Sequence, residues 1–125
     1  MAVVGIGVDL VDVRRFDSIA RRRGAPLGKR LFTERERASC EGRPRSAEHL
    51  AGRFAAKEAF LKALGTGYSN RIKWTDMEVV GIGEKISLEI RGQAQAISRR
   101  RKVKRMHLSI THTADQAAAV VVLES

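Results

Sequence analysis

The sequence has a single cysteine, Cys40, so it can form no internal disulfide. No cysteine and histidine pair has the spacing of a structural zinc site. The first apolar run, Ala2 to Val8, ends at Asp9 and is far too short to span a bilayer. No basic flank precedes that run, and the sequence shows no signal peptide or membrane anchor. We therefore expect a cytoplasmic protein that has no membrane partner.

Acidic residues are also scarce, with 14 Asp and Glu against 24 Lys and Arg, for a net charge of +10. Such an excess attracts polyanions, acidic proteins or phosphorylated ligands. The basic residues form four clusters: 14–15, 21–23, 43–45 and 99–105. They keep nucleic-acid binding open as an alternative. Only six aromatic residues are present, however, which is too few for a base-stacking platform, so we expect no nucleic-acid partner.

The length of 125 residues fits one domain, 1–125, with an apolar fraction of 43% that is ordinary for a protein with a packed core. Asp12 is a plausible N-cap, and Thr33 with Glu36 has the pattern of a capping box. Helices are expected at 13–23, from 34 to before 42, at 46–64 and at 93–100. Strands are expected at 3–9, 77–80, 85–91, 106–111 and 117–123. Helices and strands intermix without a regular repeat, which predicts an α+β fold.

Glu58 is the first candidate for chemistry, because it lies beside a mostly apolar face of the helix expected at 46–64. A buried carboxylate without a partner is costly, so Glu58 should meet a lysine, an arginine or a metal ion. Lys62 follows it by one helical turn, and a plain ion pair between the two is the alternative interpretation.

Asp9 is the second candidate. In the strand expected at 3–9, Val4 and its alternate neighbours face one side, while Gly5, Gly7 and Asp9 face the other. The missing glycine side chains would let a ligand approach the backbone there, and Asp9 at the strand end would bind a cation. A role in capping a turn or helix is the alternative. Two carboxylates with phosphate oxygens and water would form a normal magnesium site.

The strand expected at 106–111 places His107, Ser109 and Thr111 on one face. This face is either a ligand wall or a solvated surface. A hydrolase triad from Ser109, His112 and Asp115 is disfavoured, because no nucleophile elbow surrounds the serine. A glycine-rich stretch at 65–67 lacks the lysine of a phosphate-binding loop and, by itself, indicates a helix C-cap.

Three segments taken together resemble the acyl-carrier-protein synthase family of 4′-phosphopantetheinyl transferases. They are Gly5-Ile-Gly-Val-Asp9, the run from Arg53 to Gly67, and His107-Leu-Ser-Ile-Thr-His112-Thr. The resemblance spans nearly the whole chain, and the middle run is its most specific part. It implies the fold of that family, with an antiparallel sheet packed against a long helix.

The resemblance also implies an activity and its residues. Members of the family transfer the 4′-phosphopantetheine arm of coenzyme A to a serine of an apo acyl carrier protein with Mg²⁺, in fatty-acid or polyketide biosynthesis. Asp9 and Glu58 match the magnesium ligands, and Lys62 matches a lysine near the coenzyme A phosphates. The remaining residues implied to bind coenzyme A are Arg53, Gly65, Thr66, His107, Ser109 and His112.

Partners are implied in the same way. Arg14, Arg21 and Arg22 match the surface that receives the acidic helix of the carrier protein. Family members of this length resemble homotrimers with active sites shared between neighbouring subunits. The nucleophile belongs to the carrier protein, which agrees with the lack of a convincing catalytic serine.

One departure from the family stands out. The family usually has a Gly-Lys-Pro or Gly-Arg-Pro turn where this chain reads Gly83-Glu84-Lys85. This departure leaves open whether the turn makes the nucleotide contact that the resemblance implies. A non-catalytic relative that kept the fold is the other alternative. It would make the metal carboxylates dispensable, yet Asp9 and Glu58 are both present.

Overall fold

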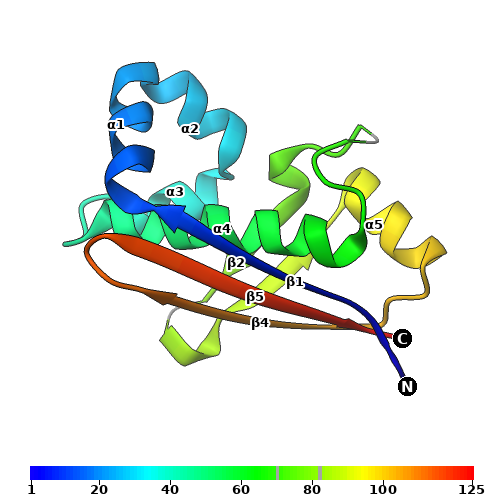
Figure 1. The fold of residues 1–125 in the computed structure, drawn as a ribbon. Coiled ribbons are helices and arrows are strands. Elements are labelled where there is room, and N and C mark those ends of the chain that lie inside the picture. Colours follow the sequence, from blue (N-terminus) through cyan, green and yellow to red (C-terminus); the bar gives the residue numbers. More distant parts are fainter. Residues whose placement is uncertain (70, 82) are drawn as a thin grey trace.

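A three-stranded antiparallel sheet lies along one long helix (Figure 1). The structure is a computed structural model that describes residues 1–69, 71–81 and 83–125, without the side chain of Glu84. The sheet has the order β1 (Val3–Asp12), β5 (Gln116–Glu124) and β4 (Arg105–His112). The helix is α4 (Ser46–Leu64), which packs on β1 and β5. This is the α+β fold with the sheet-on-helix packing that the sequence predicts.

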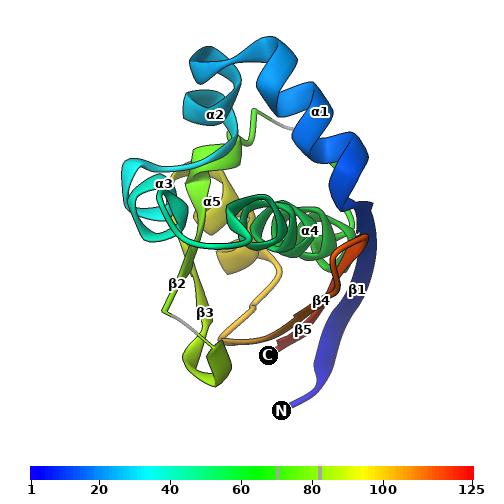
Figure 2. The ribbon, with the colours of Figure 1, turned by 90° about the vertical axis from the view of Figure 1, so that its left-hand side faces the viewer.

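The other elements surround α4 (Figure 2). Helices α1 (Val13–Arg23), α2 (Ala25–Leu31) and α3 (Glu34–Cys40) follow β1 and lie above and beside α4. A second sheet pairs β2 (Met77–Val80) with β3 (Ser87–Ile90), and α5 (Gly92–Arg100) follows it. Two short 3₁₀ turns, η1 (Trp74–Asp76) and η2 (Gly83–Lys85), complete the set. No helix in the described part of the chain has the length and apolar character needed to cross a membrane.

Local signals predict most of the element boundaries. Asp12 accepts a hydrogen bond from the backbone of Arg15 and caps α1. Thr33 and Glu36 form the expected capping box at the start of α3. Two predicted boundaries are wrong: β1 continues beyond Asp9 to Asp12, and β3 begins at Ser87 because the preceding segment contains η2. Helix α2 was not predicted at all. Ile82, at the centre of the expected hairpin, lies outside the described residues.

The two glycines of β1 allow helix α4 to pack directly against the strand. This corrects the expectation that their missing side chains leave room for a ligand. A Cβ atom on Gly7 would lie 1.9 Å from the carbonyl oxygen of Ala59, and one on Gly5 would lie 1.9 Å from that of Ala63. Both oxygens belong to α4, so the strand and the helix touch backbone to backbone. Side chains larger than hydrogen would separate them.

A buried ion pair anchors the opposite side of α4. The fully buried Nζ of Lys57 donates to Glu36 Oε1 at 2.6 Å, to the Leu31 carbonyl at 2.7 Å and to the Trp74 carbonyl at 3.1 Å. Glu36 Oε2 accepts from the backbone N–H of Val79 at 2.9 Å. Burial lowers the pKa of Lys57, and the charge of Glu36 opposes that shift. With all three ammonium protons paired, α4 is tied to α2, α3, η1 and β2.

The outer face of the large sheet is apolar and open. Ile6, Val8 and Leu10 are 67%, 60% and 61% exposed, on the face of β1 that points away from α4. On β4, the side chains of His107, Ser109 and Thr111 are likewise exposed. A monomer would leave this surface in water, which is unusual for large side chains placed so close together.

Candidate active site

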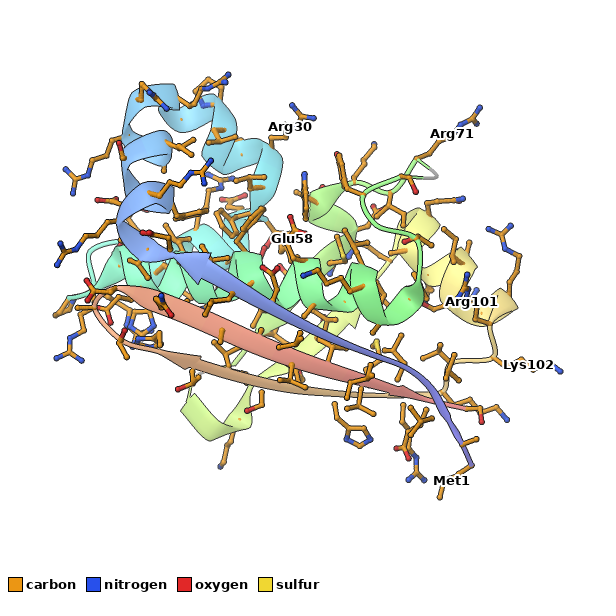
Figure 3. All side chains as sticks on the ribbon, viewed as in Figure 1. Met1, Arg30, Glu58, Arg71, Arg101 and Lys102 are labelled. Carbon is orange, nitrogen blue, oxygen red and sulfur yellow. The ribbon has the colours of Figure 1, made fainter. Side chains whose placement is uncertain are left out.

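Asp9, Glu58 and Lys62 meet where β1 crosses α4. Lys62 Nζ donates to Asp9 Oδ1 at 2.9 Å and to the carbonyl oxygen of Val8 at 3.0 Å. Glu58 lies one turn before Lys62 on α4. Figure 3 shows it on the side of the helix that faces away from β4 and β5. Since β1 runs on past Asp9 to Asp12, this carboxylate lies within the strand and not at its end, as the sequence had suggested.

The two carboxylates influence each other electrostatically. Burial raises the pKa of Glu58, the negative charge of Asp9 raises it further, and Lys62 opposes both effects. Among the described residues no cationic side chain lies within 4.0 Å of the Glu58 carboxylate, because Lys62 pairs with Asp9. The structure thus favours Asp9–Lys62 over the alternative Glu58–Lys62 pair. Glu58 keeps a half-buried carboxylate beside a second one.

The donor set fits a magnesium ion. Two adjacent carboxylates supply hard oxygen ligands with more negative charge than one lysine offsets. No group of three or more His, Cys, Asp or Glu side chains gathers as a metal site in residues 1–69, 71–81 and 83–125. Magnesium usually keeps several waters and takes one or two protein carboxylates, so a pair of acids suffices.

The predicted histidine wall lies elsewhere. His107 and Ser109 lie on the outer face of the sheet, and a 2.5 Å hydrogen bond joins His107 Nε2 to Glu124 Oε1. Because α4 covers the inner face and β5 separates β4 from β1, a single chain does not bring them to Asp9 and Glu58. His112 points inward, with Nδ1 3.0 Å from Glu48 Oε1.

Arg53 is buried near His112, away from the two carboxylates. Its guanidinium donates to the carbonyl oxygens of His49 and Gly81, both at 3.5 Å, and to Ser39 Oγ at 3.3 Å. Its Nε has no hydrogen-bond partner within residues 1–69, 71–81 and 83–125. Arg53 and His112 line a pocket of about 120 Å³, so these two predicted residues share a site with each other.

The glycine-rich stretch caps α4, as its sequence indicates. Gly65 has a φ of 82°, and its N–H donates to the carbonyls of Leu61 and Lys62 at 3.0 and 3.1 Å. The N–H of Thr66 donates to the Leu61 carbonyl at 3.2 Å. This left-handed cap places Thr66 one helical turn beyond Lys62.

The three arginines of the expected docking surface are exposed on α1. Arg14 pairs with Asp115 at 3.0 Å and Arg21 with Asp17 at 2.9 Å. Beside them lies an apolar groove of about 340 Å³ that the sequence did not reveal. Its walls come from α1, α2 and the N-terminal half of α4, and include Phe16, Leu27 and Leu50. The four-residue spacing of Leu27 and Leu31 is the signal that would have predicted α2.

Comparisons with known proteins agree on one family. Residues 5–121 match the model of the 4′-phosphopantetheinyl transferase superfamily. A holo-[acyl-carrier-protein] synthase of Geotalea daltonii is 41% identical and one of Geobacter sulfurreducens is 42% identical, each over 98% of both chains.

Two solved structures share the fold. The Bacillus anthracis holo-(acyl-carrier-protein) synthase in complex with CoA (3′,5′-ADP) has a TM-score of 0.80 and 36% identity, over 98% of this chain and 97% of that one. The Neisseria meningitidis synthase has a TM-score of 0.88 and 28% identity, over 99% and 100%. The chain therefore belongs to the 4′-phosphopantetheinyl transferase superfamily, among its holo-(acyl-carrier-protein) synthases, and is a transferase.

Proposed function

We propose that Asp9, Glu58 and Lys62 form the site at which this chain transfers the 4′-phosphopantetheine group of coenzyme A to a serine of an apo acyl carrier protein. The products are holo acyl carrier protein, for fatty-acid or polyketide biosynthesis, and adenosine 3′,5′-bisphosphate. The observation that carries the proposal is the meeting of two carboxylates from different elements, close enough for Asp9 to raise the pKa of Glu58. The synthase relatives and the coenzyme A complex support it.

Asp9 and Glu58 would hold the magnesium ion, whose positive charge offsets the charge that develops during phosphoryl transfer. Lys62 has the reach to contact the diphosphate, because its ammonium already lies at the mouth of the site on Asp9 and is half exposed. The carrier-protein serine oxygen attacks the β-phosphorus, and the bond from that phosphorus to the bridging oxygen breaks. This chain therefore positions and neutralises the reacting groups and supplies no nucleophile.

Mass spectrometry tests this assignment directly. The protein is mixed with coenzyme A, Mg²⁺ and an apo carrier protein, and the phosphopantetheine mass increase is followed over time. Asp9→Asn and Glu58→Gln should each lower kcat/KM by roughly 100-fold or more, as for loss of a preorganised charged group. Glu34→Gln, an exposed carboxylate on α3, is the matched control. Retained turnover in the Asp9→Asn/Glu58→Gln double variant would place the reaction elsewhere.

We also propose a homotrimer with shared active sites. The outer sheet face exposes the apolar side chains of Ile6, Val8 and Leu10, and a neighbouring copy would bury them on assembly. A neighbouring copy seated there would carry its His107 and Ser109 toward another subunit's site, which the sheet prevents within one chain. Val8→Glu should yield a monomer by sedimentation with little activity. A fully active monomer would refute the shared site.

The carrier protein is proposed to dock on α1. Its acidic surface would meet Arg14, Arg21 and Arg22, and the groove beside Phe16 offers apolar contact. Arg14→Glu should raise the KM for the carrier protein at low salt, and the effect should shrink as salt rises. Lys104→Glu makes the same charge change at the far end of the molecule and serves as the control. An unchanged KM for Arg14→Glu would exclude this surface.

We further propose that the chain works as one domain, 1–125, in the cytoplasm. The family model spans nearly all of it, and α4 contacts elements from both halves. Cell fractionation, with the carrier protein as the marker of its compartment, tests the location.

A further inference from the structure

One run of cations has no part in the proposed transfer. Six of the seven residues 99–105 are Lys or Arg, and all six of these side chains are exposed. The run extends from the last turn of α5 to the first residue of β4. Figure 3 shows Arg101 and Lys102 at the same end of the molecule as Met1, away from α1.

Four of these cations surround an open hollow of about 710 Å³, which we call the basic hollow. Its lining joins positive and aliphatic side chains: Arg99, Lys102, Lys104 and Arg105 with Met1 and Val103. The side chain of Met1 is 88% exposed. The basic hollow therefore offers cations and apolar surface to the same ligand.

The charge of the basic hollow is not neutralised by the protein. Within the described residues, no carboxylate side chain lies within 4.0 Å of the side-chain nitrogens of its four cations. Glu124 is opposite Arg105 in the β4–β5 ladder, but its carboxylate is hydrogen-bonded to His107 at 2.5 Å. An anion from outside the chain would offset the repulsion among the cations.

The end of α5 accounts for only part of the cluster. Arg99 and Arg100 lie in its last turn, where positive charge stabilises the negative end of the helix dipole. Lys102 lies beyond the helix in a Schellman cap: its N–H donates to the Arg99 carbonyl and the N–H of Val103 donates to the Ser98 carbonyl, both at 3.0 Å. Lys102 has a φ of 61°, a conformation that favours glycine. Glycine would fit this position better, so the fold itself does not account for the lysine.

The composition of the basic hollow favours one class of polyanion. None of the six aromatic residues falls in 99–105 or in β1, so the hollow offers no ring on which a nucleic-acid base could stack. Exposed aliphatic side chains among Lys and Arg are instead typical of a protein surface that meets an anionic bilayer. The cations there contact lipid phosphates, while the aliphatic groups enter the headgroup region.

We propose that the basic hollow is a peripheral contact site for the surface of an anionic phospholipid bilayer. The site lies at the end of the molecule away from α1, so a bilayer contact leaves α1 open to solvent. This revises the expectation of no membrane partner, which rested on the lack of a spanning or anchoring segment. The contact is electrostatic, reversible and screened by salt, which agrees with the cytoplasmic location proposed above. The inference does not depend on the proposed transfer activity.

Co-sedimentation with lipid vesicles tests the proposal. At low salt the protein should bind vesicles that contain phosphatidylglycerol and should not bind vesicles of phosphatidylcholine alone, and raised salt should release it. Arg99→Gln/Lys102→Gln should lower the partition coefficient by roughly tenfold or more, because each cation near an anionic surface contributes roughly fivefold. Failure of the wild-type protein to bind the anionic vesicles overturns the proposal.

Lys29→Gln/Arg30→Gln is the matched control. It removes one lysine and one arginine from the exposed surface of α2, so its net charge equals that of the test variant. It should keep most of the wild-type affinity for anionic vesicles. Equal losses in the two variants would mean that net charge alone drives binding, and would contradict a site at the basic hollow.

Lys102→Gly separates binding from folding. Glycine readily adopts a φ of 61°, so the urea midpoint of this variant should stay at the wild-type value or rise, while its vesicle affinity should fall several-fold. Undiminished vesicle binding by this stable variant would contradict the proposal. A single-stranded RNA oligomer provides the last comparison. If Arg99→Gln/Lys102→Gln lost affinity for the RNA and kept its affinity for vesicles, the basic hollow would be a nucleic-acid site and the proposal would be wrong.

Discussion

Replacing Gly7 by alanine should disable the enzyme without touching a reacting group. The added Cβ would lie 1.9 Å from the Ala59 carbonyl oxygen, whereas real Cβ atoms essentially never come closer than 3.0 Å. The strand must therefore move away from α4 by about 1 Å or more. Asp9 lies two residues further along the same strand and moves with it, while Glu58 stays on the helix.

Two magnitudes follow from that displacement. Overpacking at a close contact costs about 1–3 kcal/mol of unfolding free energy. A misplacement of about 1 Å in a catalytic group costs roughly 100-fold in rate. Gly7→Ala should therefore lower kcat/KM by roughly 100-fold and reduce the urea midpoint moderately, with Mg²⁺ affinity reduced as well.

Gly28→Ala is the matched control for this prediction. Gly28 lies in α2, and the nearest atom to its added Cβ is the Arg37 Cδ, at an ordinary 3.8 Å. It should keep wild-type kcat at saturating carrier protein and wild-type Mg²⁺ affinity, and its stability should be unchanged or higher, as for glycine to alanine within a helix. If Gly7→Ala retained wild-type turnover and Mg²⁺ affinity, the close backbone contact would not set the position of Asp9.

Three further outcomes are expected. Lys57→Met should lower the unfolding free energy in urea by about 3–5 kcal/mol, because it leaves Glu36 charged and buried, and Lys57→Met/Glu36→Leu should recover much of that loss. Burial alone would raise the pKa of Glu78. Hydrogen bonds from Thr33 and Arg91 and the positive charges of nearby arginines outweigh burial, so the pKa is lowered. The ionised Glu78 therefore stabilises the fold above its unfolded-state pKa, and this contribution is lost as pH falls through its folded-state pKa. In urea titrations, Glu78→Gln should reduce the decline of the unfolding free energy at acidic pH. Burial raises the pKa of Cys40, so iodoacetamide should modify it only as fast as the protein opens.

Local sequence patterns predicted the helix caps and strand faces, because these features depend on interactions between residues close in sequence. Asp12 and Thr33 each meet partners three residues away, so their roles as caps are readable without the fold. The apolar alternation of β4 likewise follows from its own residues. Helix α2 was not predicted. It contains Pro26 and Gly28, two poor helix formers, but Pro26 falls in the first turn, where proline is tolerated.

Contacts between residues far apart in the sequence were not predicted. Lys57 and Glu36 are both charged and would ordinarily be placed on the surface, and nothing in their spacing signals a buried pair 21 positions apart. The glycines of β1 were correctly recognised as a bare face, but a bare face alone does not say whether a ligand or a helix fills it. The carboxylate pair itself was predicted from the family resemblance, since the spacing alone left an ion pair with Lys62 open.

The orientation of Glu58 follows from the residues on either side of it. Successive residues on a helix point about 100° apart, so Lys57, Glu58 and Ala59 face three directions. Lys57 is held by three hydrogen bonds to α2, α3 and η1, and Ala59 is pressed against Gly7 of β1. Two contacts that take no part in chemistry thus fix the rotation of α4. The fixed rotation of α4 directs the Glu58 side chain toward Asp9 before any ligand binds, and only its side-chain torsions remain free.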